Sequence, residues 1–128
     1  MRTITSLSIL IRATGVVTLV LGVLFWTHHA LALIPLHIAL GTVLVLALWA
    51  LAVAAALHGA PTRLVTLALV TGFILPLLGM LQTRLVPGSG HWVIQVIHLA
   101  VGGFAIRLGW QLGSAAKGAP AVRATVRP

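Results

Sequence analysis

Two histidines far apart in the sequence each begin the same short pattern. After His37 and after His98 there is an Ala at the second position, a Gly at the fourth and a Trp at the twelfth, and the two copies are 61 residues apart. Both histidines lie in strongly apolar stretches, where an imidazole is costly unless something binds it. Neutral imidazole is a frequent metal ligand. The repeated pattern therefore predicts that His37 and His98 share one metal centre.

Heme iron suits such a pair of ligands. A heme held by two histidines needs one neutral imidazole on each side of the iron, from separate helices at a matching depth. We expect His37 and His98 to hold one heme iron between them. A second heme would need a second pair, and the positions about 14 residues beyond each ligand are Leu51 and Leu112. One heme is therefore predicted.

Glycines accompany both histidines and recur on the stretches that precede them. Gly41 and Gly102 follow the ligands by four residues, which places them on the same helix face one turn deeper. Four more glycines form two pairs, each pair seven residues apart in the first and third apolar stretches: Gly15, Gly22, Gly72 and Gly79. All six are candidates for heme contact, because small residues admit the edge of a wide ring. The second interpretation is a close helix crossing, which uses the same residues.

Other polar residues lie beside the same ends of these stretches. We expect Arg84 and His91 to contact the heme propionates as donors and positive charges; the alternative for His91 is an interfacial position without a ligand. His28 and His29 follow the first stretch, and His58 ends the second. For these three histidines the simplest interpretation is an interfacial or loop position.

Composition indicates that the solvent of this chain is lipid. The 128 residues are one domain's worth of chain, 60% hydrophobic and only 6% charged, which is too much apolar surface for a soluble domain to bury. Asp, Glu and Cys are absent, which excludes side-chain carboxylate mechanisms, disulfides and covalent heme attachment through cysteine. The net charge of +8 favours anionic lipid or an acidic partner subunit over nucleic acid.

Four apolar stretches are long enough to cross the roughly 30 Å hydrocarbon core of a bilayer. They cover about residues 7–26, 34–57, 64–86 and 91–113. Because the connections are short, neighbouring helices should be antiparallel. We predict an all-α, integral membrane, four-helix up-down-up-down bundle over residues 1–113, built from two tandem helical hairpins. A basic tail, residues 114–128, is expected to be mobile or held by a partner.

The distribution of basic residues predicts the orientation. On the face opposite both termini there is one, Arg84. The other seven lie on the side of the termini: Arg2, Arg12, Arg63, Arg107, Lys117, Arg123 and Arg127. The positive-inside rule then places both termini in the cytoplasm of a bacterial-type inner membrane. His37 and His98 fall in the outer half of the bilayer.

These features resemble two families of heme-binding membrane proteins. Histidines on the second and fourth helices and glycines on the first and third are similar to the diheme cytochrome b bundle and to one half of heme A synthase. Residues 78–82 and 95–98 are similar to the helix pairs of the latter, and the resemblance covers roughly residues 10–112. It implies that His37 and His98 are axial ligands of b-type heme. The chain departs from the first family in offering two ligand histidines rather than four, and from the second in having no acidic residue, so neither heme modification nor electron transfer across the whole membrane is expected.

We expect a membrane heme protein that takes part in electron transfer near the outer face, as a subunit of a larger complex rather than a stand-alone enzyme. The alternative is a heme-free accessory subunit of a respiratory or photosynthetic membrane complex. The expected partners are membrane lipid, further membrane subunits or a second copy of the chain, and a quinone. A Soret band in the purified protein would distinguish the two functions.

Overall fold

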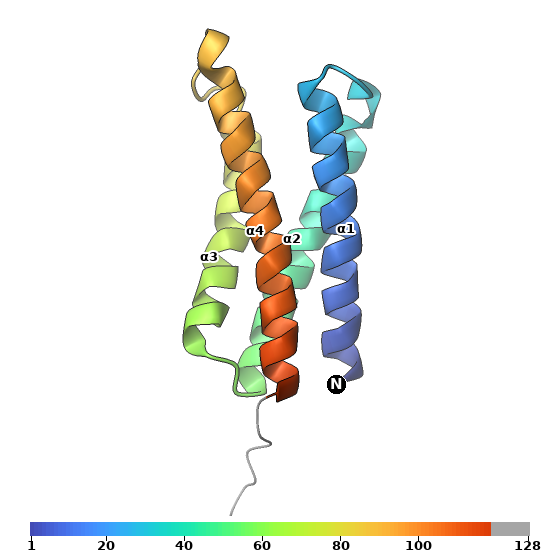
Figure 1. The fold of residues 1–128 in the computed structure, drawn as a ribbon, viewed down its shortest axis with the longest axis vertical. Coiled ribbons are helices and arrows are strands. Elements are labelled where there is room, and N and C mark those ends of the chain that lie inside the picture. The colour runs from blue at the N-terminus through green and yellow to red at the C-terminus, as the bar shows by residue number, and fades with distance from the viewer. Residues whose placement is uncertain (119–128) are drawn as a thin grey trace, which may run out of the picture.

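In the computed structural model, which describes residues 1–118, the chain folds into four long helices. They are α1 (Arg2–Trp26), α2 (Ile34–Leu57), α3 (Thr62–Leu81) and α4 (His91–Gly118), with single 3-10 turns, η1 (Leu31–Leu33) and η2 (Gly88–Gly90), before α2 and α4. Figure 1 shows an antiparallel bundle in which the N-terminus and the last turn of α4 lie at the same end. We call this the terminal end, and the opposite one, where α2 and α4 begin, the histidine end.

The surface of the bundle is apolar on its outside as well as its inside. The most apolar windows of the four spans have mean hydropathies of 2.2, 2.5, 2.3 and 1.5, each over a helix long enough to cross a membrane. Large apolar side chains such as Leu57, Phe73 and Met80 are more than 60% exposed on the isolated chain. Apolar surface of this extent faces lipid. The chain is an integral membrane protein with the predicted all-α four-helix architecture.

The four helices follow one another around the bundle. Within residues 1–118, each helix packs against its sequence neighbours, α1 packs against α4, and α2 meets α4 across the diagonal, whereas α1 and α3 have no close backbone approach. Because α2 and α4 both begin at the histidine end, they run parallel to one another. The shorter diagonal of the bundle therefore joins the two helices that carry His37 and His98.

The packed core lies in the terminal half. The largest fully buried side chains there belong to all but α3 and are exposed by 2% or less: Ile4, Ile11, Leu44, Leu48, Leu51, Leu108 and Leu112. Small residues let the helices approach, since a Cβ on Gly113 would meet the Ser8 side chain and one on Gly109 would lie 2.8 Å from Ile11. In lipid, such van der Waals packing rather than removal from water holds helices together.

The third helix ends at Leu81, short of the predicted end near Val86. Three polar residues follow it, and the amides of Arg84 and Leu85 both donate to the Leu81 carbonyl, at 2.8 and 3.0 Å. Val86 has a φ of 49° and precedes Pro87, which disfavours a helical conformation for the residue before it. The turn formed by residues 82–86 therefore ends this helix, and a hydropathy pattern does not reveal such a turn.

The fourth helix continues through residues that the sequence assigned to the tail. Residues 114–118 are helical rather than part of a mobile segment. Ala116 is 3% exposed and belongs to the core, and Lys117 lies in the last turn, where a cation complements the helix dipole. Similarly, α1 begins at Arg2, before the apolar stretch itself. The rest of the predicted tail, residues 119–128, lies outside the described residues.

Candidate functional site

The two repeated histidines lie side by side at the histidine end. His37 is in the first turn of α2, and His98 is the eighth residue of α4. The centres of their imidazole rings are 6.4 Å apart, and the ring planes are inclined by 44°. The parallel course of α2 and α4 along the short diagonal brings them together, because each helix begins at the same end of the bundle.

One nitrogen of each imidazole, Nδ1, has no hydrogen-bond partner in the described chain. Nδ1 of His37 and Nδ1 of His98 are buried, and neither has a partner among residues 1–118. The backbone of Thr18 lies near the His37 ring without bonding Nδ1, and the Phe25 ring meets the imidazole edge to face at 5.4 Å. A buried polar group without a partner costs about 1–3 kcal/mol. Two such nitrogens therefore lie in the same part of the bundle without a hydrogen-bond partner among residues 1–118.

Two of the predicted glycines flank the histidine rings. A Cβ on Gly22 of α1 would lie 3.8 Å from Cε1 of His37, and one on Gly79 of α3 would lie 3.3 Å from Cε1 of His98. At these two positions, α1 and α3 therefore have no side chain beside the imidazoles of α2 and α4. Any larger side chain at these positions would occupy the space beside the rings.

The partner glycines in each pair have a different environment. A Cβ on Gly15 would meet Ile106 of α4, and one on Gly72 would meet the Trp49 ring of α2. The structure does not bring Gly15 and Gly72 to the histidines; they allow close helix crossings, the second of the two roles open from the sequence. Trp49 also donates a 3.1 Å hydrogen bond from Nε1 to the Leu69 carbonyl, which ties α2 to α3.

The glycines four residues beyond the histidines have less crowded surroundings. A Cβ on Gly102 would lie 3.4 Å from Leu19, in ordinary contact, and a Cβ on Gly41 would have nothing within 4 Å. A methyl group added at Gly41 would therefore make no steric contact. It serves as a control for the glycines that do contact an imidazole.

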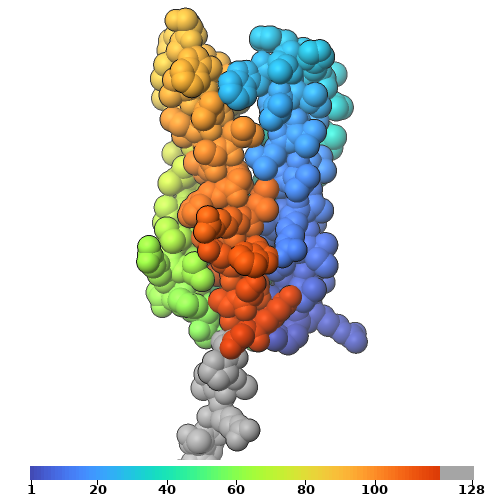
Figure 2. All heavy atoms as spheres, viewed as in Figure 1, coloured from blue at the N-terminus to red at the C-terminus, as the bar shows by residue number. Residues whose placement is uncertain are grey.

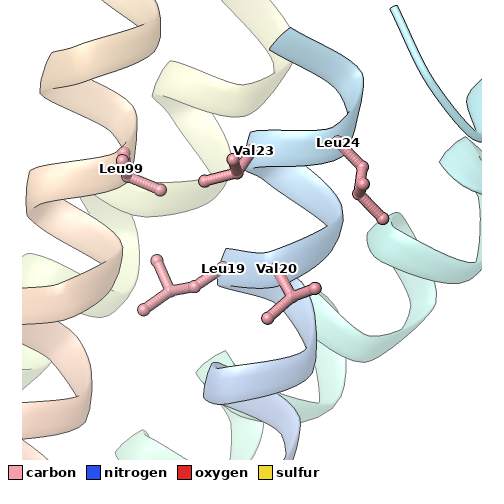
Figure 3. Close-up of a pocket in the computed structure, with 5 residues that line it drawn as sticks. All are labelled: Leu19, Val20, Val23, Leu24 and Leu99. Carbon is pink, nitrogen blue, oxygen red and sulfur yellow. The ribbon is translucent and has the colours of Figure 1, made fainter. Parts of the chain in front are cut away.

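An open apolar hollow lies between α1 and α4 beside Leu99, the residue that follows His98. Its volume is about 420 Å³, and Figure 3 shows its lining residues, four from α1 and one from α4: Leu19, Val20, Val23, Leu24 and Leu99. Leu99 follows His98 directly and would lie 4.0 Å from a Cβ on Gly22. In the space-filling view the surfaces of α1 and α4 separate toward this end (Figure 2). The hollow can accept an apolar ring edge or chain beside the imidazoles.

The predicted propionate partners lie further out at the same end. Arg84 is exposed in the loop after α3, and His91 is the first residue of α4. His91 precedes His98 by seven residues, which places it on the same helix face about 10 Å outward. His29 bonds Thr27 locally, at 3.1 Å, and His28 is exposed in the same loop. Within residues 1–118, neither forms a hydrogen bond or a ring contact with His37 or His98.

His58 belongs to the opposite end. Its Nδ1 donates to the Ala54 carbonyl at 2.8 Å, and the residue is exposed. Its hydrogen bond is satisfied within its own helix, as expected for an interfacial histidine.

Phe25 is a contact of the pair that the sequence did not indicate. Its counterpart in the second half of the chain, at the 57-residue offset that relates Gly15 to Gly72, is Gln82. Because the repeat does not copy this aromatic residue, the pattern that reveals the histidines cannot reveal Phe25. Its position three residues after Gly22, on the neighbouring turn of α1, is the one available signal.

The described part of the chain offers two neighbouring imidazoles as possible metal ligands. Residues 1–118 contain no group of three or more His, Cys, Asp or Glu side chains placed to bind a metal. Zinc in proteins takes three or four protein ligands, so the two histidines would not complete a zinc site by themselves.

Comparison with known proteins does not identify a family for this chain. A scan of family models and searches of curated proteins and of solved structures find no match for this chain. Its function must therefore be argued from the site.

Proposed function

We propose that this chain is a b-type heme protein of the membrane, in which His37 and His98 hold one heme. The proximity of the two rings carries the proposal. His37 and His98 are 61 positions apart in the sequence, yet their ring centres lie 6.4 Å apart between two parallel helices.

The surroundings of the rings support the same assignment. Iron bound at Nε2 would leave Nδ1 as the protonated nitrogen of each ring, and both Nδ1 atoms are buried here. Ligating histidines usually donate that proton to a carbonyl or another acceptor, and the Thr18 backbone lies nearest to this role for His37. Gly22 and Gly79 leave the sides of the rings free of side chains.

A bound heme would supply one-electron chemistry. His37 and His98 would hold it and fix its position in the bundle. Arg84 and His91 would neutralise the propionates. The apolar hollow between α1 and α4 would offer apolar side chains to a ring edge or to the chain of a quinone. The chain would then take part in electron transfer, as a subunit of a larger complex rather than as a stand-alone enzyme.

Charge supports an orientation for this activity. Of the Lys and Arg within residues 1–118, Arg84 lies at the histidine end and five lie in the terminal half: Arg2, Arg12, Arg63, Arg107 and Lys117. Cytoplasmic loops are rich in such residues. We place the terminal end in the cytoplasm and the histidine pair near the outer face, in line with the resemblance to the cytochrome b bundle and to half of heme A synthase.

An absorption spectrum tests the proposal. The purified protein reduced with dithionite should show the bands of a low-spin b-type heme, and both His37→Ala and His98→Ala should lose them. His58→Ala, which removes a histidine already satisfied at the opposite end, should retain them. A full set of bands in both His37→Ala and His98→Ala would overturn the assignment. Absence of a Soret band from wild-type protein expressed with ample heme would favour a heme-free accessory subunit.

A further inference from the structure

A second hollow, between α3 and α4 in the terminal half, combines positive charge with apolar walls. Its volume is about 530 Å³, and it is lined by residues at the start of α3 and in the second half of α4: Pro61, Arg63, Leu64, Leu67, Phe104, Arg107, Leu108 and Gln111. The two arginines come from different helices and border the same hollow. It lies far along the bundle from His37 and His98 and has no part in the proposed heme site.

The chain contains no side chain that can neutralise these arginines. Asp and Glu are absent from all 128 residues. An arginine in an apolar helix is costly unless it is paired or reaches the interface. Arg107 lies 16 residues beyond His91, or about 24 Å along α4, within a hydrocarbon core about 30 Å thick. This depth is close to the boundary on the terminal side, within reach of the phosphate layer.

The start of α3 adds to the positive potential of the hollow. No acidic residue stands in its first turn, and Pro61 at the N-cap provides no side-chain hydrogen bond. Arg63 instead places a cation at the positive end of the helix dipole, an arrangement that is unfavourable by itself. An anion bound between Arg63 and Arg107 would reverse the sign of that interaction.

We propose that this hollow binds an anionic phospholipid. Its phosphodiester would lie between the guanidinium groups of Arg63 and Arg107 with the Gln111 amide as a further donor, since guanidinium groups bind phosphate through paired hydrogen bonds. An acyl chain would lie along the remaining walls, which are apolar: Leu64, Leu67, Phe104 and Leu108. Basic pockets between membrane helices on the cytoplasmic side are suited to such head groups. The combination of a charged rim and apolar walls favours a lipid over an acidic protein segment.

Native mass spectrometry of the full-length protein tests this site. The protein is stripped of lipid in detergent and incubated with phosphatidylglycerol or with phosphatidylcholine. We expect one phosphatidylglycerol to be retained, with phosphatidylcholine retained much less. Each of Arg63→Gln and Arg107→Gln should weaken retention about fivefold, and the double variant about 30-fold, since one such charge near an anionic lipid contributes about 1 kcal/mol. Arg12 is exposed on α1 and lies outside the hollow, so the matched substitution Arg12→Gln should leave the retention of phosphatidylglycerol unchanged.

Several results would overturn the assignment. Equal retention of phosphatidylglycerol by wild type and by a double variant that remains monodisperse would place the lipid elsewhere, and equal retention of the two lipids would exclude charge recognition. Displacement of the lipid by millimolar inorganic phosphate would identify a phosphate site rather than a lipid site. Arg63→Lys with Arg107→Lys keeps the charge but loses the paired hydrogen bonds, and should retain the lipid better than the double glutamine variant and less well than wild type. The heme spectrum of the glutamine variants should be unchanged, so that failure here is separable from failure of the heme proposal.

Discussion

The two halves of the bundle use the same four helices in different ways. In the terminal half, large aliphatic side chains from α1, α2 and α4 interlock over small residues, and many are fully buried. In the histidine half, α2 has no buried residue before Leu44, and α4 has Ile94 alone before Ala105 within the described chain. The terminal half holds the helices together by packing, and the histidine half leaves two imidazoles unsatisfied. Stability and the proposed chemistry are therefore separated along the membrane normal.

The glycine pairs show the same division at the level of single residues. Gly15 and Gly72 lie against side chains of neighbouring helices, whereas Gly22 and Gly79, seven residues later, lie against the imidazoles. In each pair, the first glycine allows a close helix crossing near the middle of the bundle, and the second leaves space beside an imidazole at the histidine end. Substitutions at these glycines can therefore separate effects on stability from effects on heme binding.

The largest loss of stability is expected from Gly72→Ala. The added methyl group would overlap the Trp49 ring, which cannot move without losing its hydrogen bond to the Leu69 carbonyl. Overpacking of this kind costs about 1–3 kcal/mol. Thermal unfolding in detergent should show the loss, whereas Gly41→Ala, with nothing within 4 Å, should match or exceed wild type. Equal stability of Gly72→Ala and Gly41→Ala would contradict the tight crossing.

A different outcome is expected from Gly79→Ala. Its Cβ would lie 3.3 Å from Cε1 of His98, so the ring must shift by a few tenths of an ångström. We expect heme binding to weaken about tenfold, or about 1.4 kcal/mol, with little change in thermal unfolding of the heme-free protein. Heme titration followed at the Soret band provides the measurement. If the substitution destabilises the heme-free fold as much as Gly72→Ala does, the functional division between the two glycines is wrong.

The two repeated tryptophans should differ in importance. Trp49→Phe removes one hydrogen bond between α2 and α3 and should cost about 0.5–1.5 kcal/mol. Trp110 is 54% exposed, and Trp110→Phe should have almost no effect on unfolding. The comparison is made by unfolding both variants under the same detergent conditions. Equal effects would mean that the tryptophans act as an aromatic belt alone.

The smallest effect is expected from Arg84→Gln at the histidine end. An exposed ion pair contributes about 0.2–1 kcal/mol, so loss of one propionate partner should weaken heme binding by no more than a few-fold and leave the visible bands unchanged. Heme titration at low and at moderate ionic strength would reveal this contribution, since salt screens it. A complete loss of heme would assign Arg84 a far larger role than its exposed position supports.

The sequence determined the main features of this fold because each has a local cause. Continuous apolar stretches predict the four spans, and the 61-residue repeat predicts that His37 and His98 form a pair. The predicted ends of the third and fourth helices, near residues 86 and 113, differ from the observed ends at Leu81 and Gly118. The left-handed conformation of Val86 and the burial of Ala116 cause these differences, and they depend on the turn and on tertiary packing.

The division of labour among the glycines could not be read from the sequence. Gly15 and Gly22 have the same spacing as Gly72 and Gly79, and nothing local distinguishes a glycine facing an imidazole from one facing a tryptophan. The contact between α2 and α4 could not be predicted from the sequence either, because the helix lengths and loops allow these helices to be adjacent or diagonal. The depth of each glycine and the arrangement of the helices are defined only in the assembled structure.

The heme-to-protein ratio tests the central claim most directly. Heme released from a known amount of purified protein, saturated with heme and freed of excess, is quantified by its absorption. The account predicts one heme per chain in the wild type and in His58→Ala, and none in the variant that carries both His37→Ala and His98→Ala. A ratio near zero for the wild type, or a ratio of one that survives loss of both histidines, would contradict it.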